Sequence, residues 1–177
     1  MKPLKHSIDF FVALTITIVL LPFMGLMALL LWVLHGENPF FTQKRVGRSG
    51  KVFTIIKFKT QGNRLNQHKS KVLNYLRETH IDEIPQLFNV LSGSMSLVGP
   101  RPHVPEHVQL YEPWQKKRLV MKPGITCLRQ LKNPGIKLNF NTFIEDDIFY
   151  VENWTLKLDV KIMINTIKVL PRLLSKV

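Results

Sequence analysis

The stretch from Thr79 to Pro102 reads T-H-I-D-E-I-P-Q-L-F-N-V-L-S-G-S-M-S-L-V-G-P-R-P and joins two adjacent carboxylates to a helix start. Thr79, Asp82 and Pro85 are start signals, because proline fits the first helical turn, where its missing N–H is no loss. Free N–H groups and the macrodipole favour anions there. Asp82 and Glu83 therefore allow two interpretations: ordinary acidic capping, or a carboxylate nucleophile beside a bound phosphate.

The residues around the carboxylates predict helices separated by polar segments. Gln61 to Lys71 predicts a polar loop, and Val72 to Arg77 predicts a helical turn or two before the carboxylates. After Pro85, apolar residues at helical spacing predict a short helix that ends at Gly93: Leu87, Phe88, Val90 and Leu91.

Arg101 stands between Pro100 and Pro102. The two prolines stiffen the backbone, so the arginine has little entropy left to lose on binding. Its planar guanidinium suits bidentate binding of a phosphate. A structural arginine in a rigid turn is the alternative interpretation.

His103-Val-Pro-Glu-His107 matches the His-x-x-Glu-His pattern of one class of zinc protease. Pro105 lies inside the segment that would have to be helical to bring both histidines to one metal ion, and no third ligand is evident. We therefore expect a structural or solvated histidine pair.

The composition is strongly basic: 25 Lys and Arg against 12 Asp and Glu give a formal charge of +13 over 177 residues. This balance predicts polyanionic partners, namely nucleic acid, anionic lipid headgroups or phosphorylated substrates. Nucleic acid is disfavoured, because aromatic residues do not interleave with the basic cluster. Cys127, the single cysteine, excludes an intrachain disulfide and is interpreted as a small packing residue.

The segment from Ile8 to Leu34 is almost wholly apolar, with only Asp9 charged. About 20 such residues suffice to cross a bilayer as a helix. The run is too long for a cleavable signal peptide, and no small-residue cleavage site follows it, so we expect it to remain in the mature protein. Lys5 and Asp9 stand four residues apart and could pair on one helix face.

Basic residues flank this segment on both sides: Lys2 and Lys5 before it, and Lys44, Arg45, Arg48 and Lys51 after it. The positive-inside rule asks both flanks to be cytoplasmic, which one straight crossing does not satisfy. Pro22 lies near the middle and would kink the helix. Two topologies remain open: a re-entrant hairpin bent at Pro22, and an ordinary anchor with its N-terminus outside.

Phe40 to Gln43 and Lys51 to Thr60 predict two short strands, joined in a hairpin by a turn at Gly47 to Gly50. Basic residues cluster on and around this hairpin, close to the membrane exit: Lys44, Arg45, Arg48, Lys51, Lys57 and Lys59. A polybasic patch for anionic lipid and a phosphate-handling site are both compatible with this cluster.

The stretch from Leu156 to Leu174 has helical periodicity, with apolar residues on or near one face: Leu156, Val160, Met163, Ile164, Ile167 and Leu170. Lysines stand beside that face, and Trp154 stands at its start. The helix could lie in the plane of the lipid headgroups or pack on the enzyme body.

Seven blocks, in order, resemble the bacterial sugar transferase family, the small monotopic phosphoglycosyl transferases of glycoconjugate, exopolysaccharide and lipopolysaccharide synthesis. They cover nearly the whole chain. The blocks are Lys5-x-x-x-Asp9, N-P-F-F-T-Q-K-R-V-G, G-K-V-F-T-I-I-K-F, D-E-I-P-Q-L-F-N-V-L, M-S-L-V-G-P-R-P, K-P-G-I-T and Y-V-E-N-W-T-L-K-L-D-V-K-I.

The resemblance implies transfer of a sugar-1-phosphate from a UDP-sugar to a polyprenyl phosphate such as undecaprenyl phosphate, with release of UMP. It implies that Asp82 is the nucleophile of a phosphosugar-enzyme intermediate, that Glu83 completes the dyad, and that Mg²⁺ at Asp82 neutralises the diphosphate. It also implies an anchor that is re-entrant at Pro22, on the cytoplasmic face of the bacterial inner membrane. Substrate contacts are expected from Arg101, Lys57, Lys59, Arg45 and Pro102.

The chain departs from the family pattern outside the dyad. Lys59 replaces an arginine, Ser94 an aspartate and Cys127 a glycine, and Gln61 stands where a methionine is usual. The arginine of a later G-R-N motif is replaced around Asn133-Pro134-Gly135. These changes bear on sugar specificity and on the level of activity.

We therefore expect a mostly helical α+β fold. Residues 1–36 form a re-entrant helix-break-helix anchor, and residues 37–177 a cytoplasmic, membrane-associated catalytic domain with a short β-hairpin and amphipathic interfacial helices. The expected partners are a UDP-sugar, polyprenyl phosphate and anionic lipids of the inner membrane, with no nucleic acid; a homo-oligomer or glycosyltransferase partners are compatible. The alternative is a catalytically weak or inactive scaffold in glycan assembly.

Overall fold

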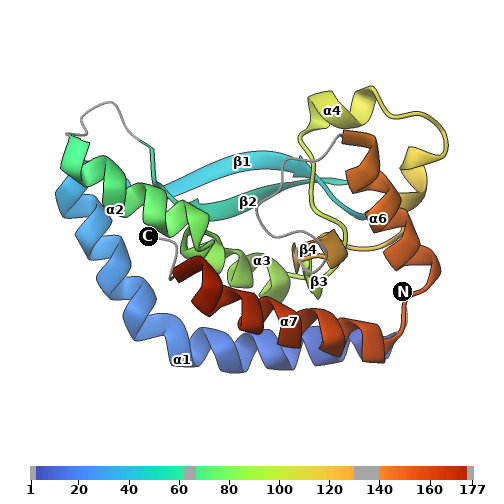
Figure 1. Cartoon of the computed structure of the whole chain (residues 1–177), viewed down its shortest axis with the longest axis horizontal. Helices are drawn as coiled ribbons and strands as arrows, with labels where there is room; N and C mark the ends of the chain where they lie inside the picture. The colour runs from blue at the N-terminus through green and yellow to red at the C-terminus, as the bar shows by residue number, and fades with distance from the viewer. Residues whose placement is uncertain (1–2, 62–66, 130–139, 175–177) are drawn as a thin grey trace.

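One long apolar helix, α1 (Pro3–His35), runs along one face of the molecule, and the other elements gather on one side of it (Figure 1). The computed structural model describes residues 3–61, 67–129 and 140–174. α1 is long and apolar enough to cross a membrane, and 17% of its most apolar window is buried. Most of its apolar side chains, including those of Phe11, Val19 and Leu26, are therefore exposed, unlike those of a core helix.

Pro22 lies inside α1, which continues through it as one helix. The helix changes direction along its length (Figure 1), as expected where proline removes a backbone hydrogen bond. The helix-break-helix expected from the sequence is therefore a single bent helix. It ends where Gly36 adopts a left-handed φ of +69°, a conformation that glycine reaches at no steric cost.

The predicted β-hairpin is confirmed. β1 (Phe40–Val46) pairs antiparallel with β2 (Val52–Phe58), from Phe40 opposite Phe58 to Val46 opposite Val52. The turn between them is the short 3₁₀ segment η1 (Arg48–Gly50). β1 runs past Gln43, the end expected from the sequence, so Arg45 belongs to the strand.

Two expectations for the segment before the carboxylates need correction. α2 (Gln67–Glu78) begins inside the stretch predicted as loop, part of which (62–66) lies outside the described residues. Thr79 does not start the next helix, because its hydroxyl donates back to the Tyr75 carbonyl oxygen at 2.7 Å. Asp82 and Pro85 lie within a 3₁₀ segment, η2 (Ile81–Gln86), which leads into the short helix α3 (Leu87–Leu91).

A second, two-stranded sheet is parallel. β3 (Ser96–Val98) pairs with β4 (Gly124–Thr126), so that Ser96 lies opposite Gly124 and Val98 opposite Thr126. A Cβ atom on Gly99 would lie 2.4 Å from the Lys122 carbonyl oxygen, and one on Gly124 would lie 2.1 Å from the Gly99 nitrogen. Glycine is required at both positions because the two backbones approach so closely.

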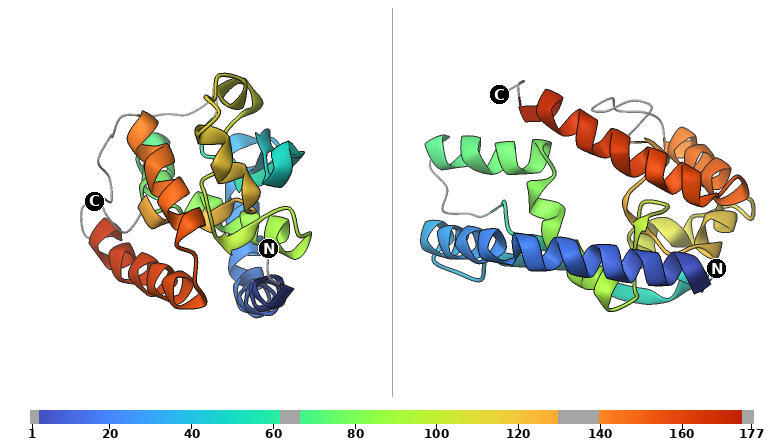
Figure 2. Two further views of the ribbon diagram at one scale, coloured as in Figure 1. Left: turned by 90° about the vertical axis from the view of Figure 1, so that its right-hand side faces the viewer. Right: turned by 90° about the horizontal axis from the view of Figure 1, so that it is seen from below.

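The remaining elements complete a mostly helical α+β fold: α4 (Pro105–Gln109), η3 (Gln115–Val120), α6 (Phe140–Glu152) and α7 (Leu156–Leu174). Figure 1 and Figure 2 show α1 and α7 along the same face of the molecule, nearest to each other where α7 begins beside the N-terminal end of α1. α7 buries Ile162 against the body and leaves Val160, Ile164 and Ile167 exposed. The buried Ile162 agrees with packing of α7 on the body, and the exposed apolar residues agree with a position in the plane of the lipid headgroups.

Two buried clusters join α1 to the body at different points along the helix. Ala13 belongs to the main core, which it shares with residues of β2, α3, β3, α6 and α7: Ile55, Val90, Val98, Tyr150 and Ile162. Farther along α1, Met24 and Leu31 form a second cluster with β2 and α2: Phe58, Leu73 and Leu76.

A buried charge cluster fixes the N-terminal end of α1. The Lys5 ammonium lies 2.6 Å from a carboxylate oxygen of Asp159 in α7 and 3.5 Å from one of Asp9. The predicted Lys5–Asp9 pair is present, but Asp159 is the nearer partner. Ser96 of β3 donates a hydrogen bond to Asp9 at 2.6 Å.

Aromatic side chains satisfy the other acceptor positions of Asp159. Tyr150 donates its hydroxyl proton to Asp159 at 2.6 Å, and the Trp154 indole N–H donates at 3.0 Å. These bonds join α1, β3, α6 and α7 in one buried network, and such networks are costly to leave partly unsatisfied.

We predict that Lys5→Met lowers the free energy of unfolding by about 3–5 kcal/mol, because it leaves buried carboxylates without their cation. Urea unfolding of the purified protein in detergent measures this change. Lys161→Met removes an exposed lysine of α7 and should leave the midpoint unchanged. Adding Asp159→Asn to Lys5→Met should recover part of the loss; a single variant as stable as wild type would contradict the role of the cluster.

Candidate active site

Glu83 is the centre of a cluster of cations that come from different parts of the fold. Its Oε1 lies 2.6 Å from Nζ of Lys57 in β2 and 2.9 Å from a guanidinium nitrogen of Arg101, in the loop after β3. The Glu83 side chain is 6% exposed. Burial alone would raise its pKa, but Arg101 and Lys57 overcome this effect and hold the pKa well below its usual range.

Asp82 is equally buried but has a different electrostatic environment. Burial and the neighbouring Glu83 charge raise its pKa to about 6, while Lys57 and Arg101 lower it. Among the described residues, the ion pairs of the dyad fall on Glu83. The two carboxylates therefore differ in pKa. Lys57 and Arg101 keep Glu83 anionic, whereas Asp82 is the more basic carboxylate of the two.

His80 precedes the dyad in a strained conformation. Its φ of 57° places a non-glycine residue in the left-handed region, where strain of about 1–3 kcal/mol is common at functional sites. Its backbone carbonyl accepts the N–H of Glu83 at 3.0 Å. The imidazole Nδ1 lies 4.0 Å from Glu83, and burial lowers the His80 pKa, so the ring is neutral at pH 7.

Asn89 holds the dyad segment against the hairpin. Its amide donates to the Thr54 carbonyl oxygen at 2.7 Å, and its side-chain oxygen accepts the Ile56 N–H at 3.1 Å. The amide thereby completes the hydrogen bonding of β2 as a neighbouring strand would. This contact sets the distance between Lys57 on β2 and the dyad.

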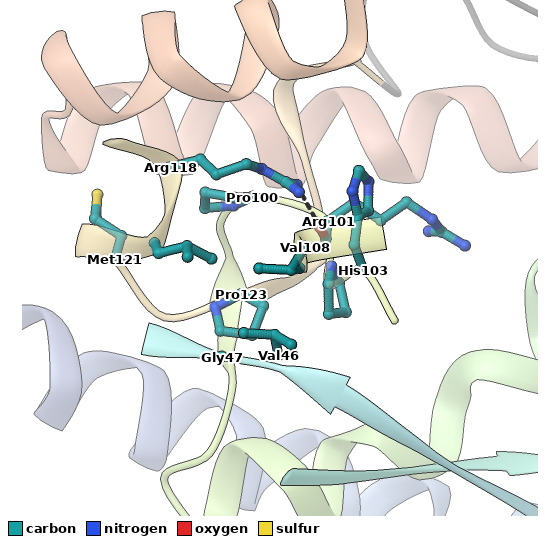
Figure 3. A pocket seen from close by; sticks show the side chains of 11 residues that line it. Val46, Gly47, Pro100, Arg101, His103, Val108, Arg118, Met121 and Pro123 are labelled. Carbon is teal, nitrogen blue, oxygen red and sulfur yellow. Dashed lines mark hydrogen bonds between the residues drawn. The ribbon is translucent and has the colours of Figure 1, made fainter. Parts of the chain in front are cut away.

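The loop that carries Arg101 is fixed from two sides. Arg45 of β1 donates to the Pro102 carbonyl oxygen at 2.9 Å, and Arg118 of η3 donates to the Arg101 carbonyl oxygen. Figure 3 shows Arg118 reaching the Arg101 backbone, while the Arg101 side chain extends away from it. A small pocket lies between these residues and the end of β1, lined among others by Val46 and His103.

Arg118 is anchored in turn by a buried pair with Asp147 of α6. It also donates to the Tyr111 hydroxyl, which lies 2.6 Å from His103 Nδ1. Burial and Arg118 lower the His103 pKa to about 3, so the ring is neutral and shares a hydrogen bond with the Tyr111 hydroxyl. His103 is therefore a structural histidine, as expected, and within the described residues no group of three potential metal ligands is present.

The structure brings together most of the substrate-binding residues expected from the sequence. Lys57 and Arg101 meet at Glu83, and Arg45 and Pro102 support the same loop. Lys59 lies apart, because its ammonium pairs with Glu37 at 3.0 Å, where the chain leaves α1. Asn89 and Arg118 were not predicted from the sequence. Asn89 is a single polar residue in an apolar run, and Arg118 follows two lysines, so neither residue stands out as functional.

The arrangement is suited to handling phosphate. The Lys57 ammonium and the Arg101 guanidinium are donors of the kind that bind phosphate oxygens, and both also stabilise the anionic form of Asp82. The positive charge comes from Lys57 and Arg101 and much less from a helix terminus, since α3 spans five residues. This corrects the macrodipole argument drawn from the sequence.

The chain belongs to the bacterial sugar transferase family, whose model matches residues 1–172. It is 40% identical over 142 residues to the sugar transferase EpsL of Bacillus subtilis, covering 75% of this chain and 70% of EpsL. It is 35% identical over 156 residues to the galactosyl transferase CpsE of Streptococcus agalactiae, covering 76% of this chain and 35% of CpsE. The chain therefore spans about a third of the length of CpsE.

A third relative carries a more specific name. The UDP-glucose:undecaprenyl-phosphate glucose-1-phosphate transferase of Caulobacter vibrioides is 34% identical over 183 residues, covering 92% of this chain and 68% of that protein.

We predict that Asp82 titrates with a pKa of about 6, above the ordinary value of 3.8. The carboxylate is therefore mostly ionised at pH 7 and becomes protonated as the pH falls through 6. Lys57→Met should raise this pKa further, because Lys57 stabilises the anion. Carbon-13 NMR of labelled aspartate, with Asp82 assigned from Asp82→Asn, measures both; a wild-type midpoint of 4 or below would contradict the prediction.

Proposed function

We propose that this protein transfers a sugar-1-phosphate from a UDP-sugar to undecaprenyl phosphate or a similar polyprenyl phosphate, as the first membrane step of exopolysaccharide or glycoconjugate synthesis. The observation that carries the proposal is the pair of carboxylates Asp82 and Glu83. Glu83 forms ion pairs with Lys57 and Arg101, and the adjacent Asp82 is a buried carboxylate with a raised pKa. Membership of the family and the name of the Caulobacter relative support it.

The proposed reaction has two displacements at the same phosphorus. A carboxylate oxygen of Asp82 attacks the sugar-bearing phosphate, and the bond to the other phosphate breaks, releasing UMP. A phosphate oxygen of the polyprenyl phosphate then attacks the aspartyl phosphate and returns the Asp82 carboxylate. Because the intermediate is covalent, the soluble donor and the membrane-bound acceptor need not occupy the site together.

Arg101 and Lys57 stabilise the charge that develops on the transferred phosphate, while Glu83 keeps them oriented. Asp82 is the residue that would hold Mg²⁺, because in proteins this ion is usually bound through one or two carboxylates together with substrate phosphates. When bound, it would neutralise charge on the diphosphate.

We also propose that α1 is re-entrant, so that residues 1–36 form an anchor and residues 37–177 a cytoplasmic domain on the inner membrane. Both ends of α1 are buried against the same body: Lys5 and Asp9 at one end, Leu31 and His35 at the other. A straight crossing would place these ends on opposite sides of the bilayer. The bend in α1 lets the helix enter and leave through one face.

The exposed strip of α7 supports an interfacial position for this helix. Val160, Ile164 and Ile167 of α7 are exposed, and the helix lies along the face of the molecule that α1 also occupies (Figure 1 and Figure 2). Exposed lysines on α7, Lys157 and Lys161 among them, suit contact with anionic headgroups.

We predict that wild-type protein, supplied with undecaprenyl phosphate and Mg²⁺, releases UMP from at least one of a panel of UDP-sugars. Asp82→Asn should abolish both this release and the labelling of the protein by radioactive sugar phosphate, because an amide does not form an acyl phosphate. Full activity of Asp82→Asn would remove Asp82 as nucleophile. Background release by both, from folded protein, would favour the scaffold alternative.

We predict that a cysteine at position 2, in a Cys127→Ser background, is not labelled by a membrane-impermeant maleimide in intact cells but is labelled in inverted vesicles. Pro22→Ala should increase external labelling, because it restores the helix hydrogen bond and straightens the anchor. External labelling of the parent protein would instead establish a crossing with the N-terminus outside.

A further inference from the structure

His80 occupies the position after α2 at which helices most often carry a glycine. α2 ends at Glu78, and the His80 N–H donates to the Arg77 carbonyl oxygen at 3.1 Å, as in a helix cap. The His80 φ of 57° lies in the left-handed region, which glycine adopts at no steric cost and other residues adopt less readily. The backbone alone would favour glycine here, so the imidazole calls for a role of its own.

The imidazole joins the two cations around Glu83. Its Nδ1 lies 4.0 Å from Oε1 of Glu83, the same oxygen that lies 2.6 Å from Nζ of Lys57 and 2.9 Å from a guanidinium nitrogen of Arg101. The three nitrogens therefore converge on one atom. The His80 carbonyl oxygen accepts the Glu83 N–H at 3.0 Å, which fixes the spacing between the ring and the carboxylate along the chain.

The His80 ring keeps a hydrogen-bond donor to offer. At 4.0 Å it lies beyond hydrogen-bonding distance of Glu83. Within residues 3–61, 67–129 and 140–174, its side chain makes no hydrogen bond. Either tautomer of a neutral imidazole carries one N–H, so a substrate oxygen can accept from the ring whichever nitrogen holds the proton.

His80 also lies on the solvent side of this cluster. Its side chain is 46% exposed and that of Arg101 is 38% exposed, whereas that of Glu83 is 6% exposed. An incoming phosphate therefore reaches Arg101 and His80 before it reaches Glu83. Asp82, the carboxylate assigned as nucleophile, follows His80 by two residues in the same turn of chain.

We propose that His80 contacts the substrate, its imidazole N–H donating a hydrogen bond to an oxygen of the phosphate that Asp82 attacks. This inference rests on the proposed function and adds one residue to the two cations that hold this phosphate. A neutral donor contributes a hydrogen bond without placing a third positive charge beside Lys57 and Arg101. The left-handed turn that ends α2 brings the ring to Glu83 for this purpose.

The test is the rate at which the full-length protein is labelled by radioactive sugar phosphate from its UDP-sugar, in a single turnover with Mg²⁺ and without polyprenyl phosphate. His80→Asn removes the imidazole but keeps a residue that tolerates the left-handed region. His80→Gly removes the imidazole and relieves the backbone strain. Both variants should lower the labelling rate at saturating donor at least tenfold.

Thermal unfolding separates this role from a structural one. Relief of strain should keep the unfolding midpoint of His80→Gly at or above that of wild type while the labelling rate falls, and His80→Asn carries the test if His80→Gly does not fold. Ser49 is the matched control, because it is the other non-glycine residue with a positive φ among the described residues and lies in the turn of the hairpin. Ser49→Gly should leave the labelling rate unchanged.

Three results would count against the assignment in different ways. Wild-type labelling rates in both folded variants, or a loss confined to His80→Gly, would overturn it while the proposed function stands. A raised KM for the UDP-sugar with an unchanged rate at saturating donor would move His80 to another part of the donor and would equally overturn it. A wild-type protein that is neither labelled by any UDP-sugar nor releases UMP would overturn the proposed function, and the inference with it.

Discussion

The buried ammonium of Lys5 is the constraint on which the architecture depends. An apolar helix of this length gains little by packing on a small body, because lipid can cover its side chains as well as protein can. The charged pair with Asp159, supported by Asp9, gives the N-terminal end of α1 a specific place that lipid cannot offer. With Leu31 and His35 buried at the other end, the whole helix lies against one side of the protein.

Asp82 and Glu83 carry the same functional group, but their surroundings give them different pKa values. Glu83 faces Lys57 and Arg101, whereas Asp82 meets burial and the charge of Glu83. The cations are themselves fixed: Asn89 sets the position of β2, and Arg118 and Arg45 hold the loop of Arg101. Preorganisation of this kind reduces the reorganisation required when a polyanion binds.

Local sequence predicted those features that depend on near neighbours. The hairpin, the short helix after Pro85 and the long apolar helix all follow from periodicity and turn residues. The adjacent carboxylates were identified as a candidate site, but the partners of Glu83 come from 18 and 26 residues away, so only a family resemblance could place them. Asp159 and Arg118 were missed because the sequence pattern alone does not distinguish a buried charged residue from an exposed one that is surrounded by other charged residues.

The ion pair between Lys5 and Asp159 joins residues 154 positions apart, which has a consequence for biogenesis. At about 5–20 residues per second, a ribosome needs on the order of ten seconds to make the intervening chain. During that time α1 has left the ribosome without its partner in α7. The Lys5–Asp159 pair can form only when synthesis is nearly complete. A nascent chain interrupted before Asp159 retains the apolar helix and the partners of Asp9 and Ala13 that precede residue 159, but Lys5 lacks its nearer carboxylate.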